Sequence, residues 1–225
     1  MKKNNIAIIL ARGGSKGIKN KNIHKVNRMP LVYWSIKSCL KANQISSVWV
    51  SSDNNKILNL SRKYGANTVK RPKRISGDHS LSEEAWLHAL IYIKNKIKNI
   101  DAVVGIQPTS PIRPSKLLNA ALKKFYKEKL DSLFTAEKIL HNFVWKKFHG
   151  KFKANYNYKK RPMRQKIEEQ YVENGSFYIF DPKKFLKKKC RLFGKIGCFT
   201  MNKINSFQID EYRDVELFES LKKYY

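Results

Sequence analysis

The chain has 225 residues, of which 47 are Lys or Arg and 17 are Asp or Glu, so its formal net charge is +30. Hydrophobic residues make up 42% and include 12 Phe, 11 Tyr and 4 Trp, which is enough for a folded core and excludes an intrinsically disordered chain. The basic residues are spread along the whole chain. The charge therefore indicates either a solvated surface or an anionic partner, and it decides nothing about the fold.

Apolar runs of strand length alternate with helical patterns over the first 130 residues. This alternation predicts an α/β fold in which a doubly wound, mostly parallel sheet is covered by helices on both faces. A Ser80-x-x-Glu83 pattern predicts a capping box at the start of one helix. The predicted strands lie at 5–10, 48–50 and 102–106, and the predicted helices at 30–43, 55–64, 80–98 and 114–128.

The segment 132–180 has a different character. Residues 132–137 have a strand pattern, aromatic and basic residues alternate over 143–160, and Asn174-Gly175 predicts a hairpin turn between two short strands. A last helix is predicted at 211–224. We interpret residues 1–225 as a single domain in which 132–180 is an inserted antiparallel arm whose surface suits a partner.

No apolar run in the sequence approaches the roughly 20 residues of a membrane span. The longest, at 6–10, follows two lysines but is too short for a signal peptide and lacks a small-residue cleavage site. We therefore expect a cytoplasmic protein with no membrane partner. The three cysteines have no Cys-x-x-Cys spacing and the five histidines are scattered, so we expect neither a disulfide framework nor a zinc site.

Three loops that follow predicted strands carry the residues of chemical interest, at 11–22, 51–53 and 107–113. In parallel α/β sheets, ligands bind outside the carboxyl ends of the strands, where such loops meet. The first loop combines three glycines with the cations Arg12, Lys16, Lys19 and Lys21. Glycines let backbone N–H groups approach an anion, and the cations neutralise phosphate. The spacing is neither a Walker motif nor G-x-G-x-x-G, and an ordinary strand–helix turn in a basic protein is the alternative.

The same loop carries a resemblance to a known family. Its sequence, Ile9-Leu-Ala-Arg-Gly-Gly-Ser-Lys-Gly17 with Lys21-Asn22, resembles the opening motif of the acylneuraminate cytidylyltransferases, the CMP-sialic acid synthetase family. Further matches follow in order along nearly the whole chain: Arg71-Pro72, Asp78 with Ser82, Gln107-Pro-Thr-Ser-Pro-Ile-Arg113, Arg164-Gln165, Asn174-Gly-Ser-Phe-Tyr178, and Ile209-Asp210 with Asp214. The resemblance implies a nucleotide-diphospho-sugar transferase-like fold with a small antiparallel dimerisation arm.

The resemblance also implies a reaction. CTP and a 2-keto-3-deoxy sugar acid of the sialic acid type would give a CMP-sugar and pyrophosphate. The anomeric hydroxyl would attack the α-phosphorus, so no enzyme nucleophile is needed, and the sequence offers no convincing Ser-His-Asp or Cys-His set. Catalysis of this kind depends on positioning and on charge stabilisation.

Roles for the nucleotide follow from the matched positions. The ribose is assigned to Asn22 and Gln107, and the cytosine to Arg71 and Ser82. The triphosphate is assigned to four residues of the basic loop: Arg12, Ser15, Lys16 and Lys21. Arg12 and Lys21 would lie near the developing charge. As alternatives, Arg71 would be a surface residue and Ser82 a residue that merely starts a helix.

The sugar acid is assigned to residues farther along the chain. Arg164 would bind its carboxylate, because a planar guanidinium suits a planar acid. Gln165 and Tyr178 would line the sugar pocket, although Tyr178 could be only a core residue. The matched positions do not distinguish a sialic, legionaminic, pseudaminic or octulosonic acid.

The metal motif departs from the family pattern. The family usually carries Asp-x-Asp there, whereas this chain has Gln208-Ile209-Asp210. We expect Mg²⁺ as cofactor, with Asp210 as its main carboxylate and a neutral carbonyl oxygen from Gln208. Asp210 could instead cap the last helix.

The basic, aromatic stretch of the arm allows two interpretations. Alternating aromatic side chains and cations can bind single-stranded nucleic acid. In the family this region forms the contact of a homodimer, and Lys146 is a candidate to reach the neighbouring active site. We favour the homodimer. Two alternatives for the function stay open: a related nucleotidyltransferase with another sugar acid or NTP, and a basic nucleic-acid-binding protein that reuses the fold.

Overall fold

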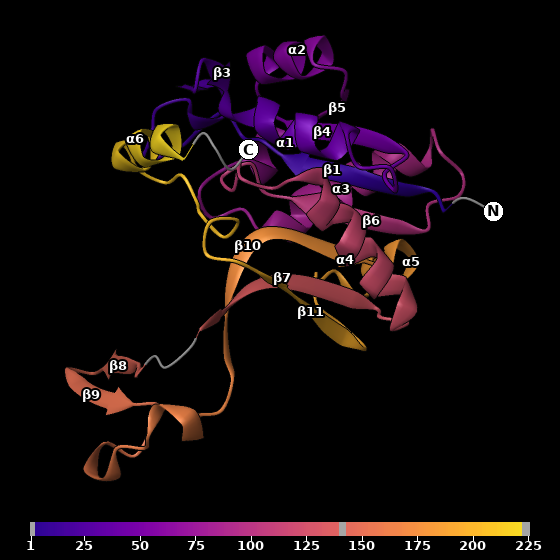
Figure 1. The fold of residues 1–225 in the computed structure, drawn as a ribbon. Coiled ribbons are helices and arrows are strands. Elements are labelled where there is room, and N and C mark those ends of the chain that lie inside the picture. The colour runs from indigo at the N-terminus through magenta and orange to yellow at the C-terminus, as the bar shows by residue number, and fades with distance from the viewer. Residues whose placement is uncertain (1–2, 140–142, 222–225) are drawn as a thin grey trace.

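The computed structural model describes residues 3–139 and 143–221 (Figure 1). In this part of the chain, a seven-stranded sheet has the order β11-β7-β10-β6-β1-β4-β5. Its strands are β1 (Asn5–Leu10), β4 (Ser47–Ser52), β5 (Asn67–Lys70), β6 (Ala102–Ile106), β7 (Ser132–Ile139), β10 (Gln170–Phe180) and β11 (Ile196–Met201). Strand β1 pairs in parallel with β4 and β6, while β10 is antiparallel to both β6 and β7. The predicted mostly parallel sheet is confirmed.

Helices cover both faces of this sheet. Ala7 and Ile9 of β1 face one core cluster with α1 (Leu31–Leu40), α2 (Asn55–Lys63) and α4 (Ser115–Lys127). Ile6 and Ile8 face the other, with α3 (Ser82–Lys94) and α5 (Pro182–Lys188). Because both faces are closed, the loops beyond the strand ends are where a ligand can reach the sheet.

The Asn174-Gly175 hairpin prediction is wrong. Strand β10 runs unbroken through these residues and makes a bulge between Glu173 and Tyr178, on either side of which it pairs with β7. Gly175 takes the left-handed φ of +62° that the turn signal indicated. The Asn174 side chain is buried, accepts from the Thr135 hydroxyl (2.6 Å) and donates to Ser206 Oγ (2.9 Å). The local turn preference is therefore used for a bulge inside a strand, which stays paired with β7 on both sides of it.

The predicted capping box of α3 is also displaced. The helix begins at Ser82, and the Leu81 N–H donates to the Glu84 carboxylate at 3.3 Å. Ser80 instead accepts from the Gly77 N–H through its hydroxyl at 3.0 Å. Glu83 is then free to pair with Arg191.

The projecting arm is shorter than the predicted 132–180. Strands β7 and β10 belong to the main sheet. Between them, β8 (Trp145–Phe148) and β9 (Lys151–Ala154) form a separate antiparallel pair, well apart from the sheet in Figure 1. Whether this arm contacts a second copy stays a prediction.

Short elements complete the described chain. The last helix, α6 (Tyr212–Ser220), lies within the predicted 211–224, of which residues 222–225 fall outside the described residues. In the described part of the chain, no helix is both long and apolar enough to cross a membrane. The remaining elements are β2 (Lys25–Val26), β3 (Met29–Pro30) and the 3-10 helices Lys21–Ile23, Lys73–Ile75, Tyr158–Lys160 and Arg164–Lys166.

Candidate active site

A cavity of about 590 Å³ opens at the carboxyl ends of β1 and β6. The cavity is lined by three segments: the loop after β1, a segment from Arg71 to Ser82 that contributes most of its residues, and residues 107–109 after β6. Asp210 and Glu211 complete the lining. Of the three predicted loops, 11–22 and 107–113 thus contribute lining residues. The third acts indirectly, because the Asp53 carboxylate accepts from the Gly13 N–H at 2.8 Å.

The basic loop passes directly against the C-terminal segment. A Cβ on Gly17 would lie 2.3 Å from the Asp210 carbonyl oxygen, so only glycine permits this approach. The Lys21 ammonium donates to Asp210 Oδ1 at 2.9 Å and to the Ile209 carbonyl at 3.1 Å. The Lys21 side chain is 13% exposed, whereas that of Asp210 is 63% exposed. The acid therefore faces solvent at the cavity while the lysine is held in place.

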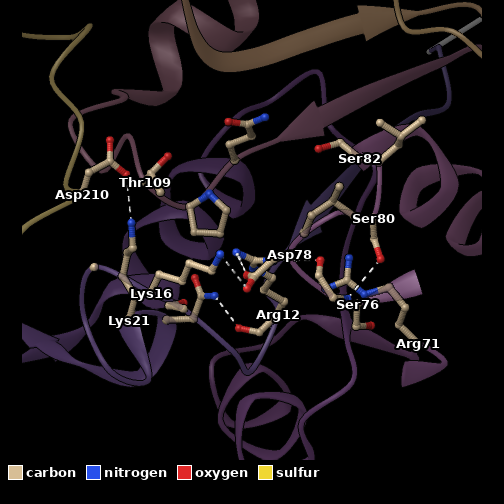
Figure 2. Close-up of a pocket in the computed structure, with 18 of the residues that line it drawn as sticks. Arg12, Lys16, Lys21, Arg71, Ser76, Asp78, Ser80, Ser82, Thr109 and Asp210 are labelled. Atoms are coloured by element: carbon tan, nitrogen blue, oxygen red, sulfur yellow. Dashed lines mark hydrogen bonds and ion pairs between the residues drawn. The ribbon is translucent and has the colours of Figure 1, made fainter. Parts of the chain in front are cut away.

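Two further cations of this loop share one acid. The Arg12 guanidinium lies 2.9 Å from Asp78 Oδ1 and donates to the Gly77 carbonyl at 2.8 Å. The Lys16 ammonium lies 3.2 Å from Asp78 Oδ2. The hydrogen bond from Lys16 and the charges of both cations hold the pKa of Asp78 below its usual value, although desolvation opposes the shift. Figure 2 shows this group in the middle of the cavity wall, between Lys21 on one side and Arg71 on the other.

Arg71 brings a buried and largely unsatisfied charge to the cavity. Its side chain lines the cavity, yet the residue is only 5% exposed. Among the described residues, its Nε and one terminal nitrogen have no hydrogen-bond partner. Burial lowers its pKa, Asp53 opposes this shift, and Arg12 adds to it. Because buried polar groups are normally hydrogen-bonded, these donors indicate a ligand with acceptor atoms. The alternative that Arg71 is only a surface residue is wrong.

The structure also brings the other predicted nucleotide contacts to the cavity: Ser15, Asn22, Ser82 and Gln107. Asn22 is buried and donates to the Arg12 carbonyl at 2.9 Å, so it also fixes the basic loop. Ser82 is the first residue of α3, which agrees with its helix-start alternative as well as with a base contact.

Two of the predicted sugar contacts, Tyr178 and Gln165, are not among the cavity's lining residues. Tyr178 is 2% exposed, packs edge-on against Trp86 at 5.7 Å, and donates its hydroxyl to Glu173. It is thus a core residue here. Gln165 is exposed on the 3-10 helix Arg164–Lys166. The side chain of Arg164 lies outside the described part of the structure, so its role stays a prediction.

The two predicted metal ligands, Gln208 and Asp210, have different surroundings. Gln208 donates through its side-chain amide to the Asn174 carbonyl at 2.7 Å and does not line the cavity, whereas Asp210 does. Asp214 is the acid that caps α6, since its Oδ2 accepts from the Asp210 and Glu211 N–H groups, both at 2.8 Å. The capping alternative for Asp210 is therefore wrong.

The donor set suits magnesium only together with a substrate. Among the described residues, no group of three His, Cys, Asp or Glu could hold a metal ion. Magnesium commonly takes one or two carboxylates and completes its shell with substrate phosphates and water. The exposed Asp210 carboxylate, which lines the cavity next to the basic loop, fits that requirement.

Sequence reasoning gave no role to Asp78, although it lies at the centre of the cation cluster. In the sequence it belongs only to the matched pair of Asp78 with Ser82. The one local signal for it is the Gly77-Asp78 pair, which is typical of a loop.

Comparison with known proteins places the chain in a family. The family model described as cytidylyltransferase matches residues 6–224. The chain belongs to the cytidylyltransferase family. An N-acylneuraminate cytidylyltransferase A from Danio rerio is 35% identical to it over 209 residues, which are 91% of this chain and 47% of the relative. The chain thus spans about half the length of that relative.

Two further matches cover nearly the full length of both chains. A CMP-N,N'-diacetyllegionaminic acid synthase from Campylobacter jejuni is 28% identical, and the match covers 96% of this chain and 94% of the relative. A solved structure of CMP:2-keto-3-deoxy-manno-octonic acid synthetase complexed with CTP superimposes with a TM-score of 0.73 at 14% identity, covering 98% of this chain and 99% of that one. At this identity the structure supports the fold.

Proposed function

We propose that this member of the cytidylyltransferase family transfers the cytidylyl group of CTP to a 2-keto-3-deoxy sugar acid. The products would be a CMP-sugar and pyrophosphate. The observation that carries this proposal is the cavity at the strand ends, where the cations Arg12, Lys16 and Lys21 lie beside the unsatisfied guanidinium of Arg71. The names of the relatives add support, because they are sugar-acid cytidylyltransferases and CMP-sugar synthases.

The cations would act on the charge that the reaction moves. The sugar hydroxyl attacks the α-phosphorus, the bond from that phosphorus to the bridging oxygen of pyrophosphate breaks, and the hydroxyl proton leaves to water. Negative charge grows on the departing pyrophosphate, and preorganised cations stabilise it. Arg71 would meanwhile donate to acceptor atoms of the cytosine ring.

We include magnesium in the proposal as a cofactor. Asp210 would hold it together with the triphosphate, and the ion would neutralise charge on the phosphates. Gln208 is left out of this proposal, because it does not line the cavity in which Asp210 lies.

We also propose a homodimer formed through the arm. The observation in favour is a group of large side chains that stand exposed there: Trp145 (45%), Phe148 (73%), Phe152 (66%) and Tyr158 (59%). Apolar surface of this kind marks interaction sites. Sedimentation of the protein would check the assembly, and a monomer at micromolar concentration would exclude it. A cytoplasmic location belongs to the same proposal, since CTP is an intracellular nucleotide.

A pyrophosphate-release screen tests the function. Four NTPs are combined with a panel of sialic, legionaminic, pseudaminic and octulosonic acids. We expect release only with CTP and only in the presence of an acid. Equal rates with a purine triphosphate would overturn the cytidylyl assignment, and no release with any pair would overturn the transferase itself.

A further inference from the structure

Arg113, at the end of the loop after β6, is buried and has no acidic partner among the residues that the structure describes. It is 2% exposed, and burial lowers its pKa to about 10, so it stays protonated at neutral pH. In the described part of the chain, its guanidinium donates to neutral acceptors: the Ser110 carbonyl (3.2 Å), the Ser176 carbonyl (2.9 Å) and hydroxyl (3.0 Å), and the Ser35 hydroxyl (2.8 Å). Burying a charge among neutral groups is costly.

The Ser176 carbonyl is shared between Arg113 and the cavity wall. It also accepts from the backbone N–H of Gln107, at 3.3 Å, and Gln107 lines the cavity. The neighbouring Gly175 lies so close that a Cβ there would be 3.2 Å from Gln107 Oε1. Arg113 thus joins the end of β6 to the bulge of β10, while its bond to Ser35 anchors it on α1.

We propose that Arg113 is a positioning residue, which sets the placement of the Gln107 wall against the β10 bulge. The inference rests on the proposed function, in which bound CTP must meet a second substrate. A reaction without an enzyme nucleophile depends on how its two substrates are placed, and a misplacement of about 1 Å costs on the order of 100-fold in rate. Arg113 itself touches neither substrate.

The first test is Arg113→Lys, which keeps the charge but cannot fork between Ser35 and Ser176. We expect kcat to fall by at least about 10-fold, while KM for CTP and for the sugar acid changes by less than about 3-fold. Calorimetry of CTP binding counts the folded sites, so a loss of folded protein is recognised by its stoichiometry. Full kcat in this variant would overturn the proposal.

Two serine variants form a matched pair. Ser176→Ala and Ser35→Ala each remove one hydroxyl acceptor from Arg113. If Arg113 positions the β10 bulge, both variants lower kcat while KM for CTP changes little, because Arg113 needs its acceptors on α1 and on β10. Ser61→Ala is the control: it removes a buried hydroxyl that donates to the Ile57 carbonyl within α2, and it should leave kcat unchanged. Full kcat in both Ser176→Ala and Ser35→Ala would overturn the proposal.

Amide hydrogen exchange separates this inference from the proposed function. If the wild type releases no pyrophosphate with any acid, the function fails, and exchange at Gln107 then decides about Arg113. We expect the Gln107 N–H to exchange faster in Arg113→Lys, with the amides of β1 unchanged. Equal exchange at Gln107 in the variant and the wild type would overturn the inference.

Discussion

The Lys21 ammonium and the Asp210 carboxylate lie 2.9 Å apart, although 189 positions separate them in the chain. Lys21 is thus the counterion of the acid that we propose as the magnesium ligand. A dication on Asp210 would weaken this pair and leave Lys21 to a phosphate oxygen. Metal and triphosphate should therefore bind together, and the free protein should bind magnesium poorly.

Asp210→Asn should lower activity on the order of 100-fold or more at saturating magnesium, because losing the ion's charge stabilisation costs several kcal/mol. Pyrophosphate release measures this, and a thermal unfolding curve checks that the variant folds. Glu216→Gln is the matched control, since Glu216 is an exposed acid of α6 that does not line the cavity. It should leave both the unfolding free energy and kcat nearly intact. Near-normal turnover of Asp210→Asn would move the metal elsewhere.

Asp78→Asn should tighten CTP binding by about 2- to 5-fold, because Asp78 competes with phosphate for Arg12 and Lys16 and exposed ion pairs are weak. Titration calorimetry at low and high salt measures the effect, which should shrink with salt as the charges are screened. The lowered pKa of Asp78 keeps it ionised above its usual value of 3.8. Its competing effect is therefore lost only as the pH falls below that value, and the difference between variant and wild type should stay constant from pH 8 to 5. Weaker binding would instead mean that Asp78 holds the loop in its binding conformation.

The elements that could be predicted from the sequence are those with a strong apolar pattern. Strand β6 is buried at every position and therefore appears as an apolar run, as does most of β1. Strand β5 was missed because only Val69 of its four residues is buried, and the edge strand β11 was missed for the same reason, since it has just two buried positions. The glycine-rich loop after β1 and the polar loop after β6, both at strand ends, located the cavity. The partners within it could not be predicted, because pairs such as Arg12 with Asp78, 66 positions apart in the chain, depend on how two separate loops are folded.

Glu83→Gln should lower the unfolding free energy by about 1–3 kcal/mol. Arg191 forks onto Glu83 at 2.6 and 2.9 Å with both side chains about four-fifths buried, and an unpaired charge left in such a place is costly. Urea unfolding measures the change. The exposed pair Lys124–Glu128 is the control, and Glu128→Gln should cost at most about 0.5 kcal/mol. Equal costs at both sites would mean that burial of the Arg191 pair contributes nothing.

Arg164→Lys tests the role that family resemblance assigns to Arg164. A charge-assisted contact contributes about 1.5–3 kcal/mol, so kcat/KM for the sugar acid should fall on the order of 10- to 100-fold while CTP binding barely changes. Steady-state kinetics with each substrate varied in turn provide the measurement. Unchanged sugar kinetics would remove Arg164 from the site.

Arg71→Met should stabilise the protein and weaken CTP binding at the same time. Methionine has a similar length and carries no polar atoms. The variant therefore removes a 5% exposed charge of which Nε and one terminal nitrogen have no partner among the described residues. Replacing a buried, unsatisfied charge with an apolar side chain should raise the unfolding free energy by about 1 kcal/mol or more.

The two effects of Arg71→Met are read from one experiment, urea unfolding with and without CTP. Without nucleotide, the variant should unfold at higher urea than the wild type. With CTP at about 100 times the wild-type Kd, the wild type should gain about 2.7 kcal/mol, and the variant should gain much less, because the guanidinium no longer donates to the base. A variant that is destabilised without CTP would show that Arg71 is a structural residue of the cavity wall. A variant that gains as much from CTP as the wild type would show that the base binds elsewhere.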